Sequence, residues 1–465
     1  MKSLWVCIVF LCSILIVACS GGETNGGEEN VTKTESEKNE LAGAVAGGGG
    51  GHPYFIHLSD IHLNEDDASI CHDRHRKCSD TGTDLWKVTQ DKLTEIMDST
   101  QPPAFLLFTG DLPAHYGLHY LSPGSSERDD HNQDIGGVLD DMAALVDSND
   151  IPLLYVPGNN DPMAGDYYSF EDAQDSLPYD LVDDPNAHYP ALNVNPSGQP
   201  IPNMVSDQHN AMGYYCAEVT DGLRVICLNS VILFNSYHEV DGISHTDAGT
   251  TQLKWLRTQL VDARNDSDKV FLAMHIPPGK DAYNTNNQGG YPSYNWAEKK
   301  VGSVYWQDYF LNLMDSFSVE VTGIFYGHTH MDELRLLYNK DGSRVTEVAV
   351  SAPGITPRNG NNPGFKLVQY DHQSKEAVDN VTYYTSGSAT TSWGNNKPYT
   401  FSKVFGKGKS IYDVVANMDT TLVNQKMASM YEVGSSGKES MTIYGLNVKY
   451  RSKSGTGEAD REEMH

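Results

Sequence analysis

The sequence has few positive charges. Its 33 Lys and Arg residues stand against 62 Asp and Glu residues, which gives a formal net charge of -29. A surface this acidic repels nucleic acid and anionic bilayers over about one Debye length, roughly 8 Å at physiological salt. We therefore expect no nucleic-acid-binding role. We find no internal repeat, and 465 residues suffice for one large domain with appendages or for two domains.

Long apolar runs are also scarce, and the one run that stands out lies at residues 4–18. It is too short to span a bilayer, which takes about 20 residues, and it is typical of a signal-peptide core. The run ends in Ile16-Val17-Ala18-Cys19, which resembles a bacterial lipobox, whose Cys becomes lipidated. We expect an exported protein that is attached to a bacterial membrane, periplasmic or at the cell surface, through a lipid anchor at Cys19. An ordinary cleaved signal with a chance Cys is the alternative.

The composition divides the chain into four parts. Residues 1–19 are the predicted leader, and residues 20–52 form a Gly- and Glu-rich segment with five consecutive glycines. Such a segment cannot bury enough apolar surface to fold and is predicted to be a flexible tether. Residues 53–371 form the predicted main domain. Residues 372–465 are polar, and we expect a C-terminal extension that packs on that domain.

Cysteine is infrequent, with seven residues at positions 7, 12, 19, 71, 78, 216 and 227. The first two leave with the predicted leader and Cys19 carries lipid, so four remain. An even number in an exported protein favours two disulfides, for which three pairings exist. We favour Cys71–Cys78 and Cys216–Cys227, because the second pair flanks a hairpin-turn signal at 220–222. Four free buried thiols are the alternative.

Short apolar segments alternate with helical patterns from residue 53 onward. Strands are expected at 54–59, 104–109, 152–156, 223–229, 270–274, 321–326, 346–351 and 365–370. Apolar residues fall on one face at 84–98 and at 251–264, as in amphipathic helices. This alternation predicts an α/β domain with buried sheets. Two long irregular stretches, 112–137 and 158–213, begin where strands stop, and open α/β sheets bind ligands there.

Five of the expected strands end in residues that can bind metals. The motifs are Asp60-Ile61-His62, Gly110-Asp111, Gly158-Asn159-Asn160-Asp161, His275-Ile276-Pro277 and Gly327-His328-Thr329-His330. Their oxygen and nitrogen donors suit Zn, Fe or Mn. Each motif alone is a common turn or a structural His. All five at strand ends favour one shared site.

The order of these motifs resembles the calcineurin-like metallophosphoesterases. The stretches 110–115, 275–279, 327–333, 352–357 and 359–365 resemble the acid sphingomyelinase-like phosphodiesterase branch of that superfamily. The resemblance covers about residues 53–371. It implies a four-layer α/β/β/α sandwich with a small C-terminal extension.

The resemblance also implies two divalent metal ions, with Zn favoured and Fe or Mn possible. One ion would be held by Asp60, His62, Asp111 and His330. The other would be held by Asp111, Asn159, His275 and His328. Asp111 would bridge them, and a bridging hydroxide would attack phosphorus.

One position departs from the family pattern. The family usually has Gly-Asn-His, and its His contacts the phosphate or protonates the leaving group, whereas this chain has Asn160. An amide can donate a hydrogen bond but cannot deliver a proton. His115, four residues after Asp111, is the candidate acid, because a His with a pKa near 6.5 suits acid catalysis around neutral pH. The alternative is a purely structural role, in which His115 only orders its loop.

The expected function is metal-dependent hydrolysis of phosphoesters. The expected partner is a small phosphoester substrate: a nucleotide, a soluble phosphodiester or a phospholipid headgroup. The sphingomyelinase carries an additional lipid-binding domain, and residues 20–51 are too short and too polar to form one, so soluble substrates are favoured. A phosphomonoesterase or an endopolyphosphatase-like hydrolase is the alternative, since Gly-Asn-Asn-Asp also resembles the latter. A metal-containing binding lipoprotein without turnover is the alternative from another class.

Overall fold

The computed structural model describes residues 51–66, 80–98, 101–147, 151–183, 189–190, 193–194, 200–201, 203–207, 212–239, 242–285, 292–434 and 445–451. The predicted leader and lipobox, nearly all of the predicted tether, and the predicted Cys71–Cys78 disulfide lie outside these residues. Within them, no helix combines the length and the apolar character needed to cross a membrane.

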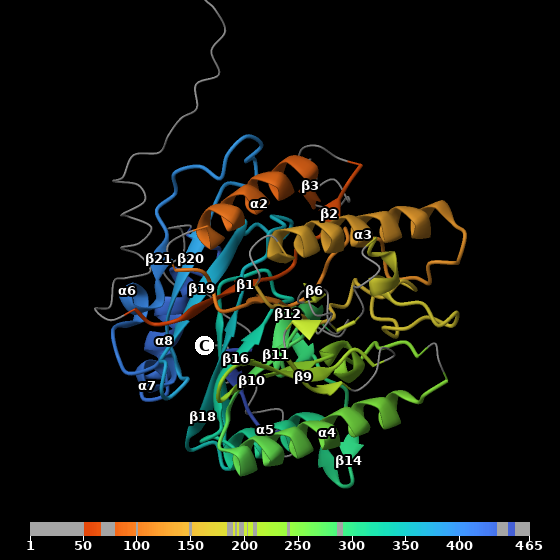
Figure 1. The fold of residues 1–465 in the computed structure, drawn as a ribbon. Coiled ribbons are helices and arrows are strands. Elements are labelled where there is room, and N and C mark those ends of the chain that lie inside the picture. Colours follow the sequence, from red (N-terminus) through yellow and green to blue (C-terminus); the bar gives the residue numbers. More distant parts are fainter. Residues whose placement is uncertain are drawn as a thin grey trace, which may run out of the picture.

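Two β-sheets form the centre of the molecule (Figure 1). The six-stranded sheet has the order β21 (Tyr399–Thr400), β20 (Ala377–Tyr384), β19 (Gly364–Tyr370), β1 (Tyr54–Leu58), β4 (Leu106–Phe108) and β5 (Leu153–Tyr155). The eight-stranded sheet has the order β22 (Asn447–Val448), β17 (Leu334–Tyr338), β18 (Val345–Ser351), β16 (Val321–Tyr326), β11 (Lys269–Met274), β10 (Leu223–Leu228), β9 (Tyr215–Thr220) and β8 (Asn203–Asp207).

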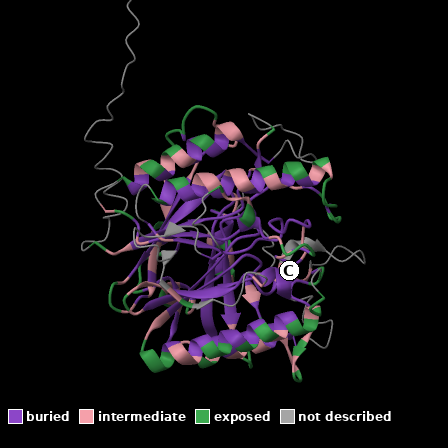
Figure 2. Ribbon diagram, turned by 45° about the vertical axis from the view of Figure 1, so that its right-hand side comes forward, coloured by how far each residue is buried: buried purple, intermediate pink, exposed green. Residues whose placement is uncertain are grey.

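The two sheets pack face to face. The ring of Phe55 on β1 lies 5.0 Å from that of Phe325 on β16 and 5.7 Å from that of Phe271 on β11, between ring centroids. The strands are buried along most of their length (Figure 2). Strands covered on both sides are expected to read as largely apolar runs, and these strands do, apart from His57, Arg224 and Thr322.

Helices cover the outer faces of both sheets (Figure 1). α2 (Thr83–Met97) and α3 (Ser126–Asp147) lie over the six-stranded sheet, and α4 (His245–Asp266) and α5 (Trp306–Ser316) lie over the eight-stranded sheet. The buried side chains of α4 recur at Leu253, Leu256 and Leu260, which is the spacing of one helical face. This arrangement confirms the predicted four-layer α/β/β/α sandwich.

Residues after 371 take part in both sheets. β20 pairs antiparallel with β19, and β22 pairs parallel with β17. Between them lie α6 (Phe401–Phe405), α7 (Ile411–Val415) and α8 (Thr420–Ala428). Shorter elements lie in the loops: β2 (Leu63–Asn64), β3 (Thr81–Gly82), β6 (Asn193–Val194), β7 (Pro200–Ile201), β12 (Lys280–Thr285), β13 (Pro292–Tyr294), β14 (Lys300–Val301), β15 (Val304–Tyr305), η2 (Pro178–Leu181) and η3 (Ser230–Leu233).

The predicted Cys216–Cys227 disulfide is wrong, since both thiols are free and buried. The predicted hairpin of β9 and β10 does form, and its first pair joins Thr220 to Leu223. Continued in register, that pairing would place Cys216 opposite Cys227. A β-bulge between Leu223 and Arg224 instead pairs Cys216 with Ile226. Because a one-residue shift moves every side chain to the other face, the two thiols lie on opposite sides of the sheet.

Candidate metal centre

The seven predicted ligands all lie directly after central strands. They are Asp60 and His62 after β1, Asp111 after β4, Asn159 after β5, His275 after β11, and His328 and His330 after β16. β1, β4 and β5 run parallel, and so do β11 and β16. The carboxyl ends of parallel strands meet at one edge, so the facing sheets bring both sets of loops together.

Four of the ligands form a first group. His62 Nε2 lies 3.3 Å from Asp111 Oδ2 and 4.0 Å from Asp60 Oδ1. His330 Nε2 lies 3.4 Å from Asp60 Oδ1. These side chains are buried and present two imidazole nitrogens and two carboxylates to a common point. These are the four residues of the first predicted ligand set, and the structure brings them together.

The second group shares Asp111 with the first. His275 Nε2 lies 3.2 Å from Asp111 Oδ2 and 2.9 Å from Asn159 Oδ1. His328 Nδ1 lies 3.0 Å from the same Asn159 oxygen. Asp60, Asp111 and His275 also offer ligand atoms within 4.8 Å of one another. The arrangement places Asp111 between the two groups, where a bridging ligand belongs.

The backbone at these positions is strained. Asp60, His62, Asp111, His328 and His330 have φ values of 50°, 49°, 66°, 73° and 62°. Residues other than glycine seldom adopt this left-handed region, and such strain concentrates at functional sites. Close packing also shapes the turns: a Cβ on Gly158 would lie 2.2 Å from the backbone nitrogen of Asp111. These turns are conformationally unfavourable, and they direct the predicted ligand side chains toward the interior of the site.

Hydrogen bonds fix the histidine rings in the orientation that metal ligands need. His62 Nδ1 donates to the carbonyl of Pro113 at 3.0 Å, and His275 Nδ1 donates to that of Thr109 at 2.6 Å. Since a carbonyl can only accept, each Nε2 keeps a lone pair for the site. His62 Nε2 is buried without a hydrogen-bond partner in the described structure. These residues fit two metal ions.

The site concentrates negative charge that needs cations. Burial alone would raise the pKa of Asp111, but His275 and His62 hold it well below its ordinary value. Burial lowers the pKa of His275, while Asp111 and Asp60 raise it to about 9. Without metal, a proton on His275 therefore balances the Asp111 carboxylate. Metal binding displaces such protons.

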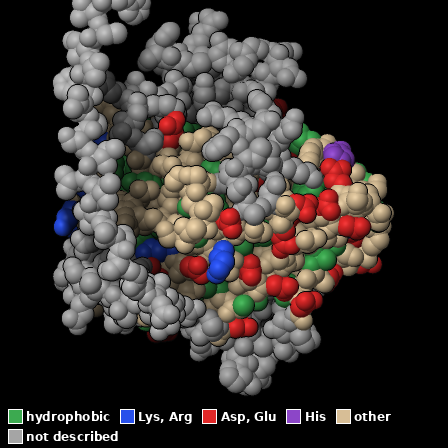
Figure 3. All heavy atoms as spheres, turned by 90° about the horizontal axis from the view of Figure 1, so that it is seen from above, with side chains coloured by type: hydrophobic (Ala, Val, Ile, Leu, Met, Phe, Trp, Pro, Cys, Tyr) green, Lys and Arg blue, Asp and Glu red, His purple; other side chains and the backbone are tan. Residues whose placement is uncertain are grey.

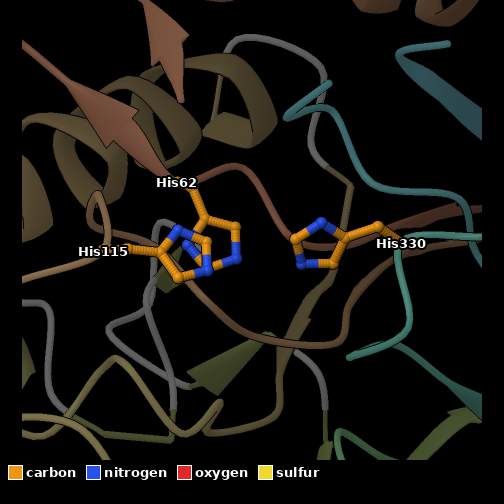
Figure 4. A group of neighbouring side chains, drawn as sticks. All are labelled: His62, His115 and His330. Atoms are coloured by element: carbon orange, nitrogen blue, oxygen red, sulfur yellow. The ribbon is translucent and has the colours of Figure 1, made fainter. Parts of the chain in front are cut away.

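His115 lies beside the first group (Figure 4). Its ring stacks on that of His62 with centroids 3.9 Å apart, and His330 faces the pair. His115 Nδ1 lies 2.9 Å from Asp80 Oδ1, and its backbone N–H donates to Asp80 Oδ2 at 3.0 Å. Arg358 and Thr356 also donate to Asp80. The structure thus brings His115 to the site and fixes its ring through Asp80.

Burial keeps the His115 ring neutral at neutral pH. Burial lowers its pKa, and His62 and Arg358 lower it further against the opposing effect of Asp80. Burial would raise the pKa of Asp80, but His115, His62 and Arg358 lower it to about 2. The pKa of His115 therefore lies below the ordinary value near 6.5 that was expected from the sequence.

Asn160 holds the shared carboxylate. Its backbone N–H donates to Asp111 Oδ1 at 2.8 Å, and its side-chain amide donates to Asp111 Oδ2 at 3.0 Å. His131 on α3 lies 2.9 Å from the Asn160 carbonyl through Nε2. Asn160 therefore contributes two hydrogen bonds to the predicted bridging ligand, consistent with a residue that donates but does not titrate.

Sequence reasoning missed the residues behind the ligands. Asp161 accepts from Tyr155 Oη at 2.7 Å and from the backbone N–H groups of Leu112 and Gly158, each at 2.6 Å, and so orders the Asp111 turn. Asp166 accepts from Asn159 Nδ2 at 2.8 Å. Asp161 is the last residue of the motif Gly158-Asn159-Asn160-Asp161, so its place in the motif could have indicated a role at the site. Asp80 and Asp166 do not follow a predicted strand, and no sequence pattern indicates that they lie near the site.

Two candidate ligand groups that share a carboxylate lie on an α/β/β/α sandwich and form a candidate site for two metal ions. The calcineurin-like phosphoesterase family model matches residues 53–332. The chain therefore belongs to the calcineurin-like phosphoesterase family and is a metal-dependent phosphoric ester hydrolase.

Several relatives carry the names of the sphingomyelinase-like branch. The chain is 26% identical over 407 residues to cyclic GMP-AMP phosphodiesterase SMPDL3A of Rattus norvegicus. The aligned residues cover 79% of this chain and 80% of the relative. It is 25% identical over 322 residues to sphingomyelinase phosphodiesterase C of Dictyostelium discoideum, covering 65% and 62%. A dimetal phosphatase structure from Danio rerio is 12% identical, with a TM-score of 0.39, covering 75% and 98%. The relatives confirm the predicted resemblance.

Proposed function

We propose that this chain hydrolyses phosphodiesters at the centre formed by the two ligand groups. The observation that carries the proposal is the position of Asp111, whose Oδ2 lies 3.3 Å from His62 Nε2 and 3.2 Å from His275 Nε2. One carboxylate between two groups of donors is what a two-metal clamp on a phosphoryl group requires. The names of the relatives favour a diesterase over a monoesterase.

The donor set favours zinc. Four imidazoles, two carboxylates and one amide oxygen suit Zn, with Fe or Mn as alternatives. Two bound ions would supply a hydroxide nucleophile at neutral pH and neutralise charge on the phosphoryl oxygens. The residues of this chain hold and orient that centre: Asn160 hydrogen-bonds Asp111, and the His62 and His275 rings are held through Nδ1.

The proton for the leaving group is assigned to His115. Its support is the Asp80 carboxylate on Nδ1, which leaves Nε2 as the atom available to the site. Because the His115 pKa is lowered, the ring carries this proton mainly under acidic conditions. We therefore expect hydrolysis of esters with poor leaving groups to fall as pH rises through the acidic range.

The substrate is proposed to be a nucleotide or another soluble phosphodiester. On the described part of the face shown in Figure 3, acidic side chains are scattered widely and basic ones are sparse. With a formal charge of -29, this surface slows association with anionic bilayers and with long polyphosphate chains. Asn160 in place of the family His is the observation that keeps two alternatives open: an endopolyphosphatase-like enzyme, and a metal-binding protein without turnover.

The direct test is hydrolysis of bis(p-nitrophenyl) phosphate and of p-nitrophenyl phosphate, with and without chelator. We expect the diester to be cleaved faster, chelator to abolish cleavage, and Zn or Mn to restore it. Faster cleavage of the monoester would favour a phosphatase. Retention of two metal ions without cleavage of any ester would favour the binding protein.

We also propose export and lipid anchoring at Cys19, which rests on the Ile16-Val17-Ala18-Cys19 sequence alone. Expression of the full chain in a bacterium should place the protein in the detergent phase, and Cys19→Ala should release it. Mass spectrometry that finds Cys19 unmodified would refute the anchor.

A further inference from the structure

Tyr167 has a strained backbone next to the metal centre. Its φ is 63°, a conformation that a bulky side chain rarely adopts. Two hydrogen bonds hold it there: the Tyr167 N–H donates to the carbonyl of Asn159 at 2.8 Å, and the His238 N–H donates to the Tyr167 carbonyl at 2.9 Å. Because Asn159 is a predicted ligand, the strained residue is tied directly to the site. Strain that the surroundings impose in this way points to a function.

The Tyr167 ring extends an aromatic surface outward from the metal ligands. It stacks on Phe234 with centroids 4.4 Å apart and planes 15° apart. Phe234 in turn meets the ring of His328 edge-on at 6.4 Å. Phe234 is buried, whereas Tyr167 is half-buried. A chain of aromatic contacts thus runs from His328, a predicted ligand of the second group, through Phe234 to the partly exposed Tyr167.

We propose that Tyr167 binds the base of a nucleoside phosphodiester by stacking. This inference rests on the proposed function, because the phosphate must lie at the ligand groups for the base to reach Tyr167. Every nucleobase has a flat π-face. An aromatic side chain can stack on that face whatever the pattern of hydrogen-bond donors and acceptors on the edge of the base. A tyrosine adds this affinity without adding positive charge. A lipid headgroup such as phosphocholine has no flat ring to place there.

The neighbouring tyrosine offers a matched control. Tyr168 contacts other rings: its ring stacks on that of His238 with centroids 4.8 Å apart, and its centroid lies 5.6 Å from that of Tyr120. The two tyrosines share one loop and have similar burial, but only Tyr167 lies against the aromatic path to His328. Tyr168→Leu therefore controls for general damage to this loop.

The test uses two substrates that differ only in the base: adenosine 5′-(methyl phosphate) and the abasic methyl ester of 1-O-methylribose 5-phosphate. Both are assayed with the metal-loaded full chain and with its variants. We expect the wild type to prefer the adenosine ester by roughly 5- to 100-fold in kcat/KM, the range that base stacking supplies. Tyr167→Leu should remove this preference mainly through KM. Tyr167→Phe and Tyr168→Leu should keep it, and two metals per chain should remain in all variants.

Two results would overturn the inference. One is an equal loss on both esters in Tyr167→Leu together with loss of metal, which would make Tyr167 only a support for Asn159. The other is a wild type that does not distinguish the esters. Should neither ester be cleaved, the proposed diesterase function fails, and binding of adenosine 5′-monophosphate against ribose 5-phosphate decides about Tyr167. Tighter nucleotide binding that Tyr167→Leu abolishes supports the inference, and equal binding contradicts it.

Discussion

Hydrogen bonds behind the predicted ligands determine which atom of a side chain faces the candidate metal site. Asn159 is the clearest case, because its amide carries an acceptor on one side and a donor on the other. Asp166 accepts from Nδ2, so the Oδ1 atom faces His275 and His328. Only the oxygen can bind a metal. A residue that contacts no predicted metal position thereby sets the chemistry of the second group.

Asp166→Asn should weaken the binding of a metal ion by the second group of ligands. The new amide can donate as well as accept, so it no longer selects the orientation of Asn159. Loss of such a supporting contact typically costs about 10- to 100-fold in metal affinity. Titration against a competing chelator should show one ion lost early and one held as in the wild type. The exposed Asp175→Asn on the same loop is the control, and two equally tight ions in Asp166→Asn would contradict the assignment.

His115→Ala should separate proton donation from phosphate binding. With a methyl leaving group we expect a loss of about 10²–10⁴-fold, the usual contribution of a general acid. With nitrophenolate, which departs unaided, the loss should be much smaller. Equal losses on both substrates would mean that His115 binds phosphate. Loss of a metal ion would make His115 a ligand, which its position with His62 and His330 allows.

Among the strands, β18 carries an unusual buried carboxyl group. Glu347 is 5% exposed in an apolar environment that includes Phe325, Ala377 and Ile411. Burial raises its pKa well above the ordinary value, and Glu376 raises it further. In the folded state Glu347 therefore stays protonated at pH values where the unfolded chain ionises.

Glu347→Gln should make stability less dependent on pH. For an acid whose pKa is raised by folding, stability is intact below the unfolded pKa, about 4.5, and falls as pH rises toward the folded pKa. The amide cannot ionise, so the variant should gain on the wild type as pH rises above that value. Urea unfolding between pH 4.5 and 8 measures this, with the exposed Asp91→Asn as control. Parallel pH profiles for Glu347→Gln and wild type would show that the group is not buried in this way.

The strands could be predicted because their signal is local. β1, β11 and β16 are largely apolar runs that end in a ligand motif, and both features are visible within ten residues. α3 was missed, and residues 126–137 were expected to be irregular. Its buried Ile135, Val138, Leu139 and Met142 have helical spacing, but two glycines and many carboxylates obscure it.

Other features depend on contacts that no local pattern reveals. Asp80 meets Thr356 across 276 residues of sequence, and only the folded sheet brings them together. The bulge that separates Cys216 from Cys227 is a one-residue shift after a correctly predicted turn. The sequence therefore predicted most of the central strands and some of the helices, but it did not predict the strand register or the contacts between residues that are far apart in the chain.

At the scale of the whole molecule, the C-terminal region completes both sheets and supports the ligand loop. Asp332, two residues after His330, is fully buried and accepts from Lys366 Nζ at 2.6 Å, Thr382 Oγ1 at 2.9 Å and Tyr399 Oη at 2.7 Å. Two of these donors lie beyond residue 371. The region is therefore part of the support for the metal centre.

Truncation after residue 371 should leave no stable hydrolase. It removes β20 and β22 from the two sheets and leaves the buried Asp332 without two of its donors. An unpaired buried acceptor costs about 1–3 kcal/mol, and the newly exposed strands are aggregation-prone edges. We expect an insoluble product or loss of the cooperative thermal transition. A soluble, cooperatively folding fragment with bound metal would contradict this account.

The central claim is that one chain holds two metal ions that share Asp111, and metal content tests it most directly. Elemental analysis of the chain purified without chelator and reconstituted with Zn should find two ions per chain. Asp111→Asn should lose both, because the shared carboxylate contacts both ligand groups, while the fold is kept by circular dichroism. A wild type that binds one ion or none, or an Asp111→Asn variant that still binds two, would contradict the account.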